Sequence, residues 1–169
     1  MKINTTFCLL AVIPLLASCA SQLITLAPVG PSPIAGGSSS IGTGYLQVFS
    51  SLDQQSDDQN QGSTDPVWYQ HTDYNIYDTA GKLVKPVNNT VGHYLTSPRL
   101  VSLRPGNYTV KAQATEWLSV NVPVIIECGR TTKVHLDENW KPPAGTQKTE
   151  VVSAPGGYPV GWRADLPTQ

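Results

Sequence analysis

The residues best suited to chemistry in this sequence are three histidines, His71, His93 and His135, and the cysteine Cys128. His71 and Asp73 stand two positions apart, so on a β-strand both side chains would share one face, as metal ligands do. No third ligand lies near them in the sequence, and we therefore expect surface histidines and no bound metal. The sequence also holds no Gly-x-Ser-x-Gly elbow and no glycine-rich phosphate loop, so we expect neither an enzyme nor a cofactor.

Aromatic residues crowd one stretch of the chain and indicate another kind of chemistry, the stacking of rings. Trp68, Tyr69, Tyr74 and Tyr77 fall within ten residues, and strand alternation must place some of these rings on each face. Rings that point away from a core would pack on sugars or on a partner protein. With Trp117 added, our candidate ligand contacts are Trp68, Tyr69, Tyr74 and Trp117. The alternative is that a second layer of structure, such as a C-terminal hairpin, covers these rings.

The first residues carry a targeting signal. An apolar run, Phe7–Leu16, ends in the letters LASC at positions 16–19, and it is too short to span a bilayer comfortably. This pattern resembles the lipobox of bacterial lipoproteins, which implies that residues 1–18 are a signal peptide and that Cys19 becomes the lipidated first residue. Ala20 is not the Asp that holds some lipoproteins at the inner membrane, so the resemblance favours the outer membrane. The alternative is an ordinary signal peptide in which Cys19 is incidental.

Composition narrows the partners and the sources of stability. The 169-residue chain has a formal net charge of −1, which gives no electrostatic basis for binding nucleic acid. Cys8 would leave with the signal peptide and Cys19 would carry lipid, so Cys128 would have no disulfide partner. Residues 19–44 are rich in Pro, Gly and Ser, which predicts a flexible tether. If extended, about 25 residues at ~3.3 Å each would reach roughly 80 Å from the membrane.

The stretch RLVSLRPGNYTVKAQA, residues 99–114, predicts the central hairpin of a β-sandwich. Apolar residues alternate on both sides of a break at residues 104–107, where Pro105 and Gly106 suit a type II turn. A turn there would place Leu103 opposite Tyr108 and would keep one face apolar on both strands.

A second predicted hairpin joins residues 118–126 to residues 130–136. A three-residue loop, 127–129, would pair Val122 with Val134 and would place Gly129 at a position that requires φ > 0. Residues 45–52, 67–78 and 82–87 also indicate strands, with a short turn at Gly81 and an edge position for Pro86. About seven strands and no convincing helix predict an all-β sandwich over residues 45–136.

The remaining residues, 137–169, form a C-terminal extension. Residues 150–153 and 158–163 flank the sequence APGG, which predicts one more hairpin with Trp162 as an anchor to the main domain. An exposed tail is the alternative interpretation.

The sequence LRPGNYTV at 103–110, together with YD…GKLV at 77–84 and TKVHL at 132–136, resembles prealbumin-like and carboxypeptidase-regulatory-like domains. The resemblance covers roughly residues 45–136 and implies an Ig-like sandwich with an accessory, adhesive or spacer role. It carries no catalytic residue. We therefore expect a non-enzymatic, membrane-anchored envelope lipoprotein with a structural or protein-interaction role. The alternative is a module that binds carbohydrate or peptidoglycan through exposed aromatic rings.

Overall fold

The computed structural model describes residues 23–33, 42–55, 68–89, 97–115 and 118–164. Within these ranges the chain is built almost entirely of β-strands, with a single 3-10 turn at Lys148–Glu150. The strands are β1 (Ile24–Thr25), β2 (Val29–Gly30), β3 (Gly44–Phe49), β4 (Leu52–Gln55), β5 (Trp68–His71), β6 (Tyr74–Tyr77), β7 (Leu83–Val87), β8 (Leu100–Leu103), β9 (Gly106–Thr115), β10 (Leu118–Ile126), β11 (Thr131–His135), β12 (Val151–Ser153) and β13 (Pro159–Arg163). No helix in these ranges is both long and apolar enough to cross a membrane.

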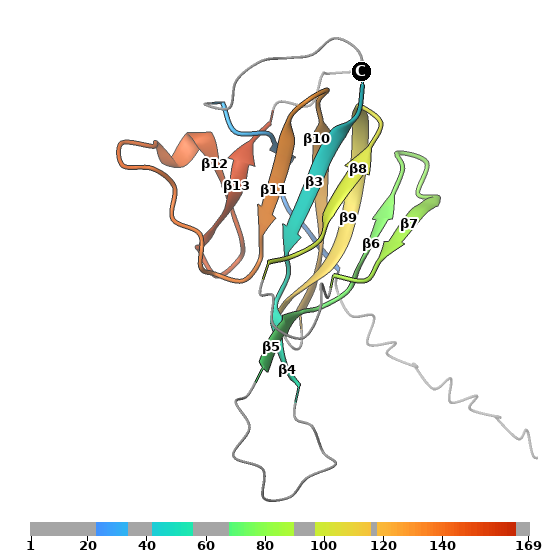
Figure 1. Cartoon of the computed structure of the whole chain (residues 1–169). Coiled ribbons are helices and arrows are strands. Elements are labelled where there is room, and N and C mark those ends of the chain that lie inside the picture. Colours follow the sequence, from blue (N-terminus) through green and yellow to red (C-terminus); the bar gives the residue numbers. More distant parts are fainter. Residues whose placement is uncertain (1–22, 34–41, 56–67, 90–96, 116–117, 165–169) are drawn as a thin grey trace, which may run out of the picture.

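Two sheets stack face to face, which confirms the predicted all-β sandwich (Figure 1). The large sheet has the order β12-β13-β2-β10-β9-β6-β7, with β1 also paired to β10. The small sheet has the order β11-β3-β8, in which β3 runs parallel to β11 and antiparallel to β8. A separate ribbon, β4-β5, extends from one end of the sandwich (Figure 1).

The core lies between the two sheets and is built by strict alternation along the strands. On β10 every second residue from Val120 to Ile126 is buried, and β3 alternates in the same way. Each fully buried aliphatic side chain contributes roughly 1.5–3 kcal/mol through removal of apolar surface from water. The large core residues include Leu46, Val48, Ile76, Val110, Val120, Val122, Val124, Ile126 and Val134.

The predicted central hairpin is wrong, because its two strands belong to different sheets. β8 pairs with β3, with Val101 opposite Leu46, whereas β9 pairs with β10 and β6. Gly106 has a φ of 151°, which is far from the value that a type II turn requires. The connection through Pro105 is therefore an arch that crosses from the small sheet to the large one.

The second predicted hairpin is also an arch. β10 lies in the large sheet, and β11 pairs with β3 in the small one. Gly129 has the predicted positive φ, 71°, but it lies in the arch between the two sheets and not in a hairpin turn. The Thr132 hydroxyl donates to the Ile125 carbonyl at 2.6 Å across the arch.

Two other hairpins are confirmed. β6 pairs with β7 around Gly81, whose φ is 77°, and Pro86 lies on β7 at the edge of the large sheet. β12 pairs with β13, and β13 in turn pairs with β2, with Trp162 opposite Gly30. The C-terminal hairpin therefore extends the large sheet, and the exposed-tail alternative is wrong for residues up to 164.

The predicted tether is wrong for residues 23–33. β1 and β2 run parallel to β10, and Val29 is completely buried. Pro28, which suggested a flexible linker, lies between β1 and β2, and its carbonyl accepts a bond from the Ala164 amide at 3.0 Å. The sandwich thus includes residues on both sides of the predicted 45–136 domain.

Candidate functional site

The structure separates the four candidate aromatic residues. Tyr69 is 52% exposed on the β4-β5 ribbon, whereas Tyr74 is 2% exposed and lies in the core. Burial raises the pKa of the Tyr74 phenol well above its ordinary value. Tyr74 as a ligand contact is therefore wrong. Trp117 and the side chain of Trp68 lie outside the described residues.

The reason for the error is a break in the predicted strand over residues 67–78. The chain leaves β5 after His71 and starts β6 at Tyr74, so the alternation begins again with Tyr74 and Ile76 facing inward. A single continuous strand through these residues would have had a different set of inward positions.

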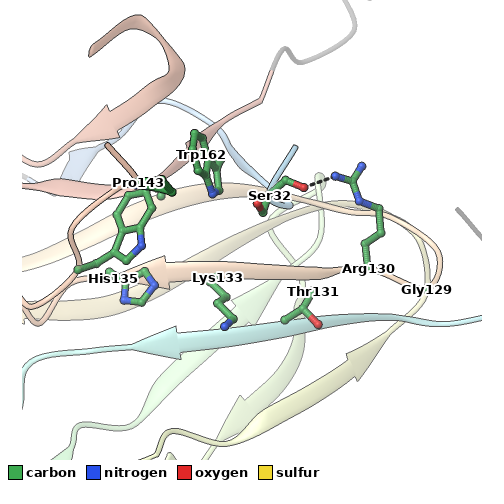
Figure 2. Close-up of a pocket in the computed structure, with 10 residues that line it drawn as sticks. Ser32, Gly129, Arg130, Thr131, Lys133, His135, Pro143 and Trp162 are labelled. Carbon is green, nitrogen blue, oxygen red and sulfur yellow. Dashed lines mark hydrogen bonds between the residues drawn. The ribbon is translucent and has the colours of Figure 1, made fainter. Parts of the chain in front are cut away.

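The rings that do line a cavity lie elsewhere, in a groove between β11 and the C-terminal segment (Figure 2). We call this the β11 groove. Its volume is about 490 Å³, within the ordinary range for small-ligand sites. It is lined by Ser32, Gly129, Arg130, Thr131, Lys133, His135, Trp140, Pro143, Gly161 and Trp162.

Alternation on β11 supplies one wall of the groove. Val134 and Thr132 point into the core, so Thr131, Lys133 and His135 fall on the outer face. Their side chains follow one another along the strand, with His135 at one end and Arg130 just beyond the other (Figure 2).

The opposite wall of the groove, β13, lies close to β11 because Gly161 has no side chain. A Cβ atom on Gly161 of β13 would lie 2.8 Å from the Lys133 carbonyl oxygen and 2.6 Å from a methyl group of Val29. Only a residue without a side chain lets β13 pass this near to β11. Gly161 thereby brings its neighbour Trp162 to the groove.

His135 is clamped between aromatic rings. Its imidazole stacks on Phe49 with centroids 4.2 Å apart and on Trp140 with centroids 5.2 Å apart, and Trp140 meets Trp162 edge to face at 5.8 Å. Burial of the imidazole lowers the pKa of His135 to about 4, which outweighs the opposing effect of Asp137. The two side chains are 3.9 Å apart, too far for a hydrogen bond. His135 is therefore neutral at pH 7.

Two cationic side chains line the groove, of which Arg130 is ion-paired and Lys133, among the described residues, is not. The Arg130 guanidinium pairs with Glu127 and donates to the Ser32 carbonyl. Lys133 is exposed and has no hydrogen-bond or ion-pair partner within the described ranges. No Asp or Glu is among the residues that line the groove.

The expected surface position is wrong for His71 and His135, which are both buried, and His71 and Asp73 do not share a strand face. His71 is buried and its Nδ1 lies 2.7 Å from the Ser50 carbonyl, whereas Asp73 lies beyond the end of β5 and accepts a bond from the Asn89 amide at 2.9 Å. Both line a second, more polar cavity of about 370 Å³. In the part of the chain that the structure describes, no group of three His, Cys, Asp or Glu side chains is placed to hold a metal ion.

The remaining candidate residues are the cysteines and His93. Cys128 lies in the arch between β10 and β11, as a free and partly buried thiol. Cys19, Cys8 and His93 lie outside the described residues.

Sequence reasoning missed Trp140 and gave Trp162 only an anchoring role. The two tryptophans are separated by more than twenty positions and come together because β13 packs against β2 and passes over β11. Nothing in the sequence around either tryptophan marks the two as neighbours, because their contact arises from tertiary packing.

Comparisons with protein-family models, with curated proteins and with solved structures find no match to this chain. The resemblance to prealbumin-like domains therefore stays a prediction, and the function must be argued from the residues themselves.

Proposed function

We propose that this chain is a non-enzymatic, lipid-anchored lipoprotein of the bacterial envelope, and that its β-sandwich acts in structure or binding next to a membrane. The observation that supports this most directly is where the folded domain begins. The lipobox-like pattern ends at Cys19, and β1 starts at Ile24. A domain that starts shortly after the signal peptide is expected if Cys19 is the first residue of the mature protein.

The short connection also limits how far the sandwich stands from the lipid. Four residue steps separate Cys19 from Leu23, and at ~3.8 Å per step they reach about 15 Å at most. This is far less than the 80 Å expected for a long tether. We therefore propose a domain held at the membrane surface.

If Cys19 carries the lipid, the pairing of β1 supports one orientation of the sandwich at the bilayer. Ile24 pairs with Val120 near the start of β10, and the β4-β5 ribbon lies at the same end because the Ser51 amide donates to the Gln113 carbonyl at 2.9 Å. The arch that carries Arg130 lies at the opposite end (Figure 1). The cationic end of the β11 groove would thus point away from the membrane.

The second role predicted from the sequence, binding of a cell-wall glycan, is favoured by a specific observation. Two half-buried tryptophans and a neutral histidine line a groove of small-ligand size. Aromatic rings of this kind present an apolar surface beside polar groups, which suits the faces of sugar rings.

The test of the anchor is membrane fractionation of Cys19→Ala. We expect the variant to leave the membrane pellet after a carbonate wash and to lose labelling by a clickable palmitate analogue, because durable anchoring depends on the acyl chains. Cys128→Ser is the matched control and should fractionate and label like the wild type. A Cys19→Ala protein that stays in the washed membranes contradicts the proposal.

A further inference from the structure

The lining of the β11 groove combines a ring platform with positive charge. Trp140 stacks on His135 and meets Trp162 edge to face, and Lys133 and Arg130 follow His135 along β11 toward the arch (Figure 2). His135 adds no charge at neutral pH, and no carboxylate lines the groove. A ligand that fits this lining has an apolar face at one end and a negative charge at the other.

One cationic side chain in the groove, Lys133, is a donor without a partner within the described residues. Lys133 is exposed and has no hydrogen-bond or ion-pair partner there. Arg130 differs, because its terminal nitrogens already contact Glu127 and Ser32 and its Nε is buried. An anionic group in the groove would supply the acceptor that the Lys133 ammonium lacks.

The backbone of β11 argues against a peptide that binds as an added strand. That mode requires a free strand edge. One edge of β11 pairs with β3, and on the other side Thr132 forms a bridge with Pro31 while Gly161 packs against the Lys133 carbonyl. Neither edge is open for a further strand.

We infer that the β11 groove is a binding site for a saccharide that carries a carboxylate, with a sugar ring on Trp140 and Trp162 and the carboxylate at Lys133. This inference rests on the second proposed role, glycan binding in this groove, and does not depend on the lipid anchor. Equal binding of a neutral and a charged saccharide would overturn this inference alone, whereas no binding of either would overturn both the inference and the glycan-binding role. The site itself depends on the groove, so the lipid anchor is tested separately.

The experiment is a titration of the full chain purified in detergent, followed by tryptophan fluorescence, so that the result does not depend on Cys19. The first probe is a carboxylate-bearing disaccharide released from purified cell-wall sacculi, and the second is neutral chitobiose. We expect saturable binding of the first probe with a fluorescence shift, and binding that is about tenfold weaker for the second.

Variants assign the two halves of the site. Lys133→Gln should weaken binding of the charged probe about tenfold and leave chitobiose unchanged, because it removes only the charge. Trp140→Ala should weaken both probes about tenfold or more. Lys85→Gln and Tyr69→Ala, which lie on β7 and on the β4-β5 ribbon, are the matched controls and should bind like the wild type.

Lys133 is exposed and unpartnered, so Lys133→Gln will fold and its result can be interpreted even if Trp140→Ala unfolds. Three results would each overturn the inference: no binding of either probe, equal binding of both probes by the wild type, or wild-type affinity in Lys133→Gln. Any of them is compatible with a lipid anchor at Cys19. Conversely, loss of the anchor in fractionation leaves this titration unaffected.

Discussion

In this sandwich some consecutive strands form hairpins within one sheet, whereas others are joined by arches that cross to the other sheet. The hairpins β6-β7 and β12-β13 keep neighbouring strands paired within the large sheet. The arches β8-β9 and β10-β11 carry the chain from one sheet to the other. All four connections are short; Gly lies between the strands in three of them, and in the β8-β9 arch Gly106 is the first residue of β9.

The comparison shows why apolar alternation does not distinguish a hairpin from an arch. In a hairpin, the apolar faces of both strands point to the same side of one sheet. In a sandwich, strands of opposite sheets also point their apolar faces at each other. Val122 on β10 and Val134 on β11 are both buried in the core without being paired. Alternation is therefore satisfied equally well in both arrangements.

The largest effect is expected at Gly44, which lies under the β10-β11 arch. A Cβ atom there would come within 2.2 Å of the Glu127 carbonyl oxygen and 2.6 Å of a methyl group of Ile126. The arch cannot move away freely, because Gly129 donates to Thr43 and Tyr45 donates to Arg130. Gly44→Ala should lower the free energy of unfolding by about 3 kcal/mol or more, as measured by urea denaturation.

Gly81→Ala in the β6-β7 hairpin provides the comparison. Its φ is 77°, but no atom lies within 4 Å of the added Cβ, so the cost is only that of the backbone conformation, about 1 kcal/mol. If Gly44→Ala cost no more than Gly81→Ala, the arch would not lie over β3.

The next effect is the pH dependence that comes from His135. The arch leads into β11, which pairs with β3. His135 therefore lies opposite Phe49 and is buried. The pKa of His135 is about 4 when folded and about 6.5 when unfolded. The unfolded chain therefore binds a proton that the folded chain does not, and stability falls as pH drops from about 6.5 to about 4. We expect a loss of about 2 kcal/mol, less than the full ~3 because solvent screens a partly accessible ring.

NMR titration of the imidazole gives the pKa directly, and His135→Phe should remove this part of the pH dependence while keeping a ring between Phe49 and Trp140. In a β10-β11 hairpin, His135 would lie on an open outer face. A measured pKa near 6.5 would favour that arrangement over the arch.

The features of the fold that depend on residues close together in the sequence could be predicted. The positions of most strands, the edge role of Pro86 and the positive φ of Gly129 follow from alternation and turn chemistry. The pairing partner of each strand could not be predicted from the sequence, because it depends on which sheet the strand joins. The tether was misjudged for the same reason: Val29 lies between Pro and Gly residues, and only its pairing with β10 buries it.

The site was harder to predict than the fold. The clustering of aromatic residues in the sequence predicted Tyr69 and Tyr74 as ligand contacts, but Tyr74 is a core residue. The groove instead joins Lys133 and His135 to Trp140 and Trp162 through the approach of Gly161 to β11. No short sequence window contains that contact, because it arises from the way the C-terminal hairpin extends the large sheet.

The smallest effect concerns the β6-β7 hairpin, whose turn is stabilised locally. Asp78 Oδ1 accepts hydrogen bonds from the amides of Ala80 and Lys82 at 3.0 and 2.8 Å, and no part of the small sheet takes part. Asp78→Ala should therefore cost about 1 kcal/mol in urea denaturation, as expected for exposed turn bonds. Asp78→Asn retains the acceptor oxygen and should remain close to the wild type. A loss in Asp78→Ala as large as that in Gly44→Ala would mean that the hairpin, like the arch, is coupled to the opposite sheet.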